Sequence, residues 1–348
     1  MEPLLSYRLW LGPMAGYTDS AMRQVCHESG AEASVSEMIS AKAVVYRDKK
    51  TFSLAFIRPE EGPVSLQLFG SEPSVMAEAA ARLATSPPGC PPIAIDINMG
   101  CPGPKVAGNG EGSALMKDPT RCYEIAAAMR RALPPSMPLT AKIRLGWDPT
   151  RKNAAEVAAA LGEAGVSLLF VHGRTRAELY NGEADWETIA ALCAVSPLPI
   201  IGNGDIRTPE DACRKMRESG VSGIMIARAA IGNPLLFAGV AAALRGEAFL
   251  PPTAKERAAA ALRQLSLAVR EKGETFAVRE SRKQIACCFS GLPGSAAVRA
   301  AIHTAESYER ICEILTSYAD SLPASAEKTG APKTEQGAAT PAGENDAP

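Results

Sequence analysis

Three reactive side chains stand at positions in the sequence where they could take part in chemistry. Cys101 lies in a Gly-Cys-Pro loop directly after an apolar run, Lys142 interrupts a second apolar run, and His172 ends a third. A thiol in such a loop can act as a general acid or a nucleophile. A lysine among apolar residues is costly unless it meets an anion or a polarised oxygen. Together the three indicate a site for a ligand of negative character.

Each of these residues also has an ordinary structural interpretation. A free cysteine is often a small packed apolar side chain, and no His or Asp stands beside Cys101 to suggest a protease-like pair, although such partners can be distant in sequence. Lys142 could extend from a loop along apolar surface, and His172 could be a hydrogen-bonded structural residue. From the residues alone, Cys101 could be either a general acid or nucleophile, or a packed structural thiol.

The elements that would position these residues alternate regularly along the chain. Short apolar runs predict strands, and the Ala-rich amphipathic stretches between them predict helices, several of which start with Asp or Thr before Pro. The predicted strands are 9–14, 33–36, 64–69, 93–98, 139–144, 168–172, 200–203 and 223–227, and the predicted helices include 73–84, 119–133, 154–164, 186–195 and 209–219. Eight strand–helix units predict an α/β fold, a (β/α)8 TIM barrel.

The active site of such a barrel lies at the carboxyl ends of its strands, where side chains alternate between inside and outside. In strand 139–144 the odd-numbered residues are apolar, so Thr140, Lys142 and Arg144 should point into the barrel. The same alternation directs further polar residues inward or toward the mouth: Ser65, Gln67 and His172.

The loops after the last two predicted strands are rich in glycine. They read Gly202-Asn203-Gly204-Asp205 and Ala227-Arg228-Ala229-Ala230-Ile231-Gly232-Asn233-Pro234. Barrels often bind phosphate at this place through backbone N–H groups, and Arg228 could add a bidentate contact. Although a glycine in a turn needs only a positive φ, the position of both loops predicts a phosphorylated cofactor.

The chain changes character after residue 237, where the strand signal stops. Residues 253–318 have helical periodicity, and from Lys255 to Arg310 ten Lys or Arg stand against six Asp or Glu, a local excess of four positive charges. We divide the chain into a barrel over 1–245, a small all-helical C-terminal domain over 246–322, and a tail over 323–348 that is poor in large apolar residues and is expected to be disordered.

Composition excludes several classes of protein. With 348 residues, 46% hydrophobic and 22% charged, the chain is neither a disulfide mini-scaffold, a coiled coil nor a mainly disordered protein. Its net charge of −1 gives no global footprint for nucleic acid. Nine cysteines without a CxxC pair indicate reduced thiols and no metal site. The lack of a long apolar run or a leader-like start predicts a cytoplasmic protein without membrane contact, and a monomer is expected.

Ten blocks of residues spread over about 8–310 complete the sequence evidence. They are Pro13-Met14-Ala15-Gly16-Tyr17-Thr18-Asp19, Ser36-Glu37-Met38, Gln67-Leu68-Phe69-Gly70, Asp96-Ile97-Asn98-Met99-Gly100-Cys101-Pro102, Lys105-Val106, Gly112-Ser113-Ala114-Leu115-Met116, Lys142-Ile143-Arg144-Leu145-Gly146-Trp147, Val171-His172-Gly173-Arg174-Thr175, Gly202-Asn203-Gly204-Asp205 and Arg228-Ala229-Ala230-Ile231-Gly232-Asn233-Pro234. In kind and order they resemble the tRNA-dihydrouridine synthase family, whose members pair an FMN-binding barrel with a helical RNA-binding domain. Two departures, Ala227 where many members have Gly and a Pro-rich stretch over 84–92, affect a backbone contact and a remote loop.

The resemblance implies a role for each matching residue. The residues expected at the flavin ring are Pro13, Met14, Ala15, Gln67, Lys142 and His172, and those expected at its phosphate are Asn203, Gly204, Asp205, Ala227 and Arg228. Cys101 would be the proton donor, and Asn98 and Arg144 would meet the target uracil. Arg174, Arg176 and Lys152 would contact tRNA phosphates, or else form a solvated charged surface.

The implied reaction is reduction of the C5=C6 bond of a D-loop uridine in tRNA. Reduced FMN would give hydride from N5, NADPH or NADH would reduce the flavin, and Cys101 would protonate C5. One alternative is a flavoenzyme that acts on a free base, which the basic helical region disfavours. Another is an RNA-binding or RNA-folding protein with an inactive barrel, which the joint presence of Cys101, Lys142 and His172 disfavours.

Overall fold

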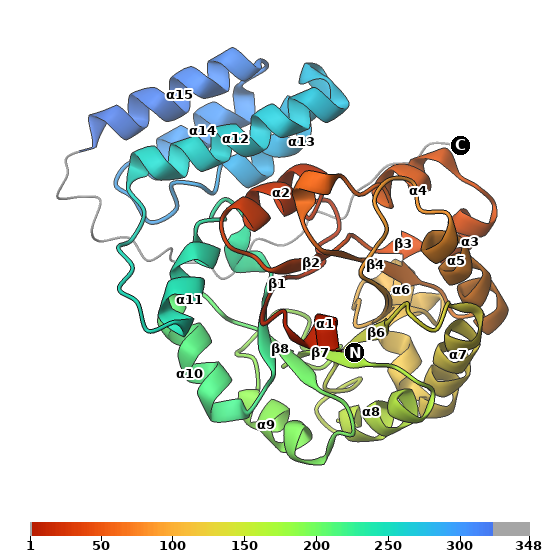
Figure 1. The fold of residues 1–348 in the computed structure, drawn as a ribbon. Coiled ribbons are helices and arrows are strands. Elements are labelled where there is room, and N and C mark those ends of the chain that lie inside the picture. Colours follow the sequence, from red (N-terminus) through yellow and green to blue (C-terminus); the bar gives the residue numbers. More distant parts are fainter. Residues whose placement is uncertain (1, 323–348) are drawn as a thin grey trace.

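A computed structural model describes residues 2–322 of the chain, and a closed parallel β-barrel forms its centre (Figure 1). The barrel strands are β1 (Leu9–Leu11), β2 (Ala33–Val35), β4 (Val64–Phe69), β5 (Ala94–Met99), β6 (Leu139–Arg144), β7 (Leu168–His172), β8 (Ile200–Asn203) and β9 (Gly223–Ile226). Each pairs with the next, and β9 closes the ring on β1. The short β3 (Ile39–Ser40) extends the pairing along β4. The predicted TIM barrel is confirmed.

The first strand is shorter than predicted. It ends at Leu11 rather than at residue 14, although the Gly12 N–H still donates to the Ile226 carbonyl at 2.7 Å. Pro13 has no N–H to continue the ladder, and the Tyr17 and Thr18 N–H groups both donate to the Met14 carbonyl. The chain therefore turns over the mouth of the barrel at this point.

Helices accompany the barrel strands, and the five predicted from the sequence are among them as α5, α7, α8, α9 and α10. They are α1 (Glu2–Leu5), α2 (Ser20–Glu28), α3 (Ala41–Val45), α4 (Lys49–Leu54), α5 (Pro73–Thr85), α6 (Pro104–Gly108), α7 (Pro119–Ala132), α8 (Ala154–Glu163), α9 (Trp186–Val195), α10 (Pro209–Ser219) and α11 (Leu236–Leu244), with short 3-10 turns η1 (Pro59–Glu61), η2 (Gly112–Lys117) and η3 (Arg228–Ala230). The starts behave as capping chemistry dictates: Asp118 accepts from the Arg121 N–H and Thr208 from the Asp211 N–H.

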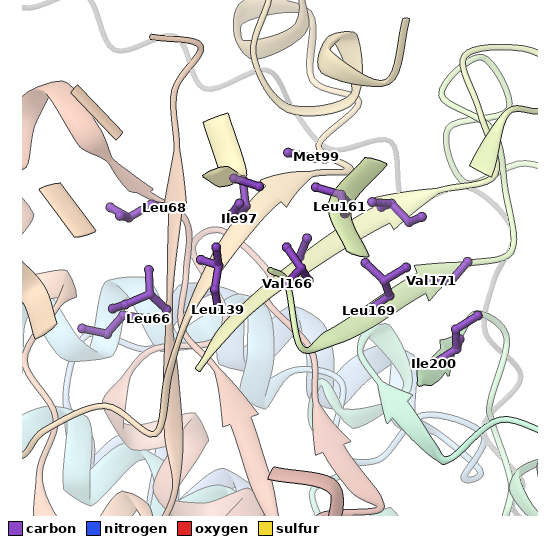
Figure 2. Packing of buried hydrophobic residues seen from close by; sticks show 14 of the residues in the cluster. Leu66, Leu68, Ile97, Met99, Leu139, Leu161, Val166, Leu169, Val171 and Ile200 are labelled. Carbon is purple, nitrogen blue, oxygen red and sulfur yellow. The ribbon is translucent and has the colours of Figure 1, made fainter. Parts of the chain in front are cut away.

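Two apolar cores follow from the alternation of side chains along the strands. Outward residues such as Leu139 and Leu169 pack with Leu161 of α8 between the strands and the helices (Figure 2). Inward residues fill the lower part of the barrel, where Trp10 and Phe170 meet edge to face at 4.9 Å between ring centroids. Because apolar side chains fill most of the lower barrel, the charged inward side chains Lys142 and Arg144 lie toward the carboxyl ends of the strands.

The C-terminal helices form a separate bundle beside α2 (Figure 1). They are α12 (Ala254–Lys272), α13 (Glu274–Ile285), α14 (Ser295–Thr304) and α15 (Tyr308–Ser321). Leu267 and Ala268 of α12 share an apolar cluster with Ala21 and Val25 of α2. Gly232, with φ of 66°, permits a close approach, since a Cβ there would come 2.8 Å from the main chain joining Cys287 and Cys288.

Ion pairs add to this contact between the bundle and the barrel. Arg263 binds Glu28 at 2.7 Å, and the Lys272 ammonium lies 2.7 Å from Asp19. Within residues 2–322, no helix has both the length and the hydropathy to cross a membrane. The predicted disordered tail over 323–348 lies outside the described residues.

Candidate active site

Polar side chains from five consecutive strands converge at the carboxyl end of the barrel. Strand register sets Asn98 beside Lys142, Arg144 beside His172, and His172 beside Asn203. Gln67 of β4 completes the group through a hydrogen bond from the Asn98 amide at 2.6 Å. The structure thus brings together the inward residues that alternation predicted, because parallel strands end at one rim of the barrel.

A chain of hydrogen bonds runs from the barrel interior to the loop that holds Cys101. Asp96 accepts from the Thr140 hydroxyl at 2.6 Å and from Gln67 Nε2 at 2.7 Å. The side-chain oxygen Oδ1 of Asn98 accepts from the backbone N–H of Cys101 at 2.9 Å. Cys101 itself is half-buried. The alternation that directs Thr140 inward also directs Asp96, its register partner on β5, into the barrel.

The ammonium group of Lys142 is buried in surroundings that disfavour its positive charge. Its Nζ donates to Asn203 Oδ1 at 3.2 Å, while Asn203 Nδ2 donates to the Met225 carbonyl at 2.8 Å. Burial and the neighbouring Arg144 lower the pKa of Lys142 to about 8, although the Asp96 carboxylate favours its charged form. A bound anion would supply the opposite charge that this lysine lacks.

His172 is neutral at physiological pH. Burial first, and then the positive charges of Arg144, Lys142, Arg174 and Arg228, lower its pKa well below 6.5. Its imidazole is therefore a hydrogen-bonding group in this structure. The same four cations give the mouth of the barrel a concentration of positive charge.

Tyr180 is a site residue that sequence analysis missed. Its ring is 49% exposed and lies under two guanidinium groups, with Arg228 at 4.8 Å and Arg144 at 5.5 Å from the ring centroid. Arg144 also donates to the carbonyl of Leu179 at 2.8 Å, which has an unusual left-handed φ of 53° for a non-glycine residue. No periodicity marks a single aromatic residue in a loop, so the sequence carried no signal for it.

Asp205 organises the arginines at one side of the mouth. It binds Arg174 at 2.7 Å, Arg228 at 3.2 Å and Arg207 at 3.6 Å, and it accepts from the Ala184 N–H. These partners lower its pKa despite partial burial. Arg174 is only 1% exposed, so a phosphate contact by this side chain would require the pair with Asp205 to open. Arg228, by contrast, remains exposed on one side.

The other predicted phosphate contacts lie farther out. The Arg176 guanidinium lies 4.7 Å from the centroid of the Trp147 ring, and the Lys117 ammonium lies 3.4 Å from the same centroid. Lys152 pairs with Asp185 at 2.8 Å. The structure places these residues around the mouth, and their contacts with RNA stay predictions.

Pro13, Met14 and Ala15 lie in the loop after β1, at the carboxyl end of that strand. The Thr18 hydroxyl closes this loop, accepting from the Met14 N–H and donating to the Gly12 carbonyl, each at 3.0 Å. The buried Glu37 carboxylate accepts from the Gly16 N–H. From the C-terminal bundle, the Lys283 ammonium lies 4.3 Å from the centroid of the Tyr17 ring, so the bundle reaches the edge of the mouth.

The sequence of this chain is similar to those of known proteins. A family model described as dihydrouridine synthase (Dus) matches residues 10–322. A tRNA-dihydrouridine synthase B from Pseudomonas aeruginosa is 38% identical over 312 residues, which is 88% of this chain and 91% of that protein. A probable tRNA-dihydrouridine synthase from Treponema pallidum is 37% identical over 297 residues, or 83% and 86% of the two chains.

Solved structures share the fold at low sequence identity. The histamine dehydrogenase from Rhizobium sp. 4-9 aligns with a TM-score of 0.52 at 12% identity, over 75% of this chain and 49% of that one. The 6-hydroxypseudooxynicotine amine oxidase from Pseudomonas geniculata N1 aligns with a TM-score of 0.53 at 13% identity, over 69% and 47%. This chain spans about half the length of each, and the likeness shows the barrel fold alone.

Proposed function

The chain belongs to the dihydrouridine synthase family, and from this we propose that it is a flavin-dependent oxidoreductase that reduces the C5=C6 bond of a D-loop uridine in tRNA. FMN would be its cofactor and NADPH or NADH its reductant, in the cytoplasm where tRNA and these nucleotides occur together. The single observation that carries the proposal is the convergence of Lys142, His172 and Asn98 with the Cys101 loop at one rim of the barrel.

The donor set of the mouth fits a flavin mononucleotide. The pKa of the neutral His172 is lowered by four positively charged side chains, those of Lys142, Arg144, Arg174 and Arg228. The carboxylate of Asp205, by contrast, is already paired with arginines. Amide and imidazole groups can form hydrogen bonds with the polar edge of the flavin ring, and the exposed Arg228 can bind the phosphate of the cofactor. An excess of N–H donors and positive charge also favours an anionic reduced cofactor. We propose Gln67, Lys142 and His172 for the ring, and Asn203, Gly204, Ala227 and Arg228 for the phosphate.

Reduction of the uracil double bond needs a hydride at C6 and a proton at C5. A flavin held by these residues would supply the hydride. Cys101 supplies the proton, since its thiol stands in a loop fixed at the rim and a thiol is a competent general acid near neutral pH. Asn98 offers an N–H that faces only the Met38 sulfur at 3.8 Å, a weak acceptor that a uracil carbonyl can replace. The guanidinium of Arg144 holds the Gly100 carbonyl at 2.8 Å and so shapes the same loop.

The bundle beside the mouth supplies the surface for RNA. Arg279 and Lys283 of α13 are exposed, and Lys283 lies at the edge of the mouth over Tyr17. Within residues 255–310, other basic side chains are held in ion pairs, among them Arg263, Lys272 and Arg310. We propose that α13 contacts tRNA phosphates while the target nucleotide, extruded from the folded RNA, enters the mouth.

The experiment separates the two halves of the reaction by flavin absorbance under anaerobic conditions. Cys101→Ala is expected to keep bound flavin and its reduction by NADPH, but to slow reoxidation by tRNA by about 10² to 10⁴, the usual worth of a general acid. Cys213→Ala, at a half-buried thiol on α10, is the matched control and should behave as wild type. Near wild-type reoxidation of the Cys101→Ala flavin by tRNA would return Cys101 to the role of a packed thiol.

A second comparison distinguishes the free-base alternative. The reduced enzyme is mixed with tRNA, with uridine monophosphate and with uracil, and reoxidation rates are compared. We expect rapid reoxidation by tRNA only. Equal rates with uracil would favour an enzyme of free pyrimidines, and a colourless protein that FMN cannot reconstitute would refute the flavin assignment.

A further inference from the structure

Asp96 is a buried carboxylate that the proposed mechanism does not use. It sits on β5 between Gln67 of β4 and Thr140 of β6, its register partners on the two neighbouring strands. It has no exposed surface, and burial raises its pKa to about 6. Because a buried charge lowers stability unless it is well paired, a carboxylate at this position calls for a function that a smaller polar group would not fulfil.

The hydrogen bonds of Asp96 lead stepwise to the loop of Cys101. Gln67 Nε2 donates to Asp96 Oδ2 at 2.7 Å, and Gln67 Oε1 accepts from Asn98 Nδ2 at 2.6 Å. Asn98 Oδ1 accepts from the backbone N–H groups of Gly100 at 3.2 Å and Cys101 at 2.9 Å. Two side-chain amides therefore connect a carboxylate inside the barrel to the main chain that carries the thiol.

The two ends of this chain decide which way each amide faces. An ionised carboxylate only accepts hydrogen bonds, and a backbone N–H only donates. Between these fixed ends, Gln67 must turn its NH₂ toward Asp96 and its oxygen toward Asn98, and Asn98 must turn its oxygen toward Cys101. Reversal of either amide would set two donors or two acceptors against each other in a buried place and leave those groups without a hydrogen bond.

We propose that Asp96 is a positioning residue that fixes the orientation of the Gln67 and Asn98 amides and thereby holds the main chain of the Cys101 loop. It touches neither substrate nor cofactor and acts through these two amides. The fixed order also leaves the second N–H of Asn98 facing the weakly accepting Met38 sulfur, as a donor for a ring carbonyl. The positioning of the loop by Asp96 does not depend on the proposed function. Only the role of the loop in holding a proton donor rests on that proposal.

The test uses two substitutions of similar shape in the full-length protein at pH 7.5. Asp96→Asn keeps an oxygen for Gln67 and can give its NH₂ to the Thr140 hydroxyl, so the order of the amides is retained. Asp96→Leu removes the acceptor. Hydrogen exchange followed by mass spectrometry reports the amides of Gly100 and Cys101, and the amides of β6 and β7 serve as an internal reference.

We expect Asp96→Leu to speed exchange at Gly100 and Cys101 by at least tenfold while the reference strands change little. Asp96→Asn should remain within about threefold of wild type, because the acceptor for Gln67 is replaced rather than removed. An Asp96→Leu protein with normal protection at both amides, or with exchange raised equally in β6 and β7, would overturn the positioning role.

A second variant covers the case in which Asp96→Leu does not fold. Gln67→Met removes both hydrogen bonds of the middle amide with a flexible side chain of similar length, and it should speed exchange at the same two amides. Normal protection in Gln67→Met would overturn the inference. Reoxidation by tRNA is measured on the Asp96→Leu sample: if the amides lose protection as expected and reoxidation is unaffected, the hydrogen-bonded chain stands, and the role of Cys101 as acid is decided by Cys101→Ala.

Discussion

The lowered pKa of Lys142 makes a quantitative prediction for flavin binding. In the free protein, burial and Arg144 bring this pKa to about 8, so at pH 9 roughly nine in ten molecules carry a neutral amine and at pH 7 roughly one in ten does. An anionic ligand favours the ammonium form and raises the pKa of Lys142 in the complex. Binding of FMN should therefore take up about 0.9 proton at pH 9 and about 0.1 at pH 7 through this group.

The sign of the accompanying affinity change follows from the same linkage. The contribution of the Lys142 charge is complete below the pKa of the free protein and is lost as the pH rises above it. Affinity for FMN should weaken by up to about tenfold per pH unit above pH 8. The phosphate of FMN is already a dianion there, and the pKa of Arg144, lowered to about 10, leaves that guanidinium mostly charged at pH 9.

Calorimetric titration of the apoprotein with FMN, in buffers of different ionisation enthalpy, measures the protons directly. Lys142→Gln should abolish the uptake at pH 9 and leave an affinity that is nearly constant between pH 7 and 9. Lys152→Gln, at a lysine paired with Asp185 on the surface, should keep the uptake, and a Cys101→Ala background removes any contribution of that thiol. Uptake of the same size in Lys142→Gln, or none in wild type at pH 9, would refute the reasoning.

Three further predictions concern stability and RNA binding. Glu61 is fully buried and accepts hydrogen bonds from Arg23 at 2.6 Å and Ser20 at 2.6 Å. Glu61→Ala should therefore lower the free energy of unfolding, measured by urea titration, by about 3–5 kcal/mol. A loss below about 1 kcal/mol would show that the ion pair is dispensable for stability. Asp96 has a folded-state pKa raised to about 6, so its contribution to stability is complete below the unfolded pKa of about 4 and is lost as the pH rises through 6. The full contribution is roughly 3 kcal/mol, of which roughly 2 kcal/mol is lost between pH 4 and 7. The stability difference between wild type and Asp96→Asn in urea should fall by this smaller amount as the pH is raised from 4 to 7. Arg279→Ala combined with Lys283→Ala should weaken tRNA binding and reduce the slope of log affinity against log salt by up to about two, whereas Arg245→Ala, at a residue paired with Glu247 beyond α11, should change neither.

Local rules were enough to predict the barrel from sequence. Alternation of apolar residues located the strands, capping residues located the starts of helices α7 and α10, and parity assigned Lys142, Arg144 and His172 to the mouth. These features depend on a few neighbouring residues at a time. The early end of β1 at Leu11 was open to the same reasoning, since Pro13 cannot continue a ladder.

What only the tertiary structure decided are contacts between residues far apart in the chain. The ring of Tyr180 beneath Arg144 and Arg228, the burial of Arg174 against Asp205 and the packing of α12 on α2 have no local pattern. The same holds for the amide chain, where Gln67 and Asn98 are 31 residues apart and their orientation depends on both ends being present. Sequence periodicity indicates which face of a strand a side chain occupies. The residue that it contacts on that face depends on how the strands close into the barrel and on which loops fold over its mouth.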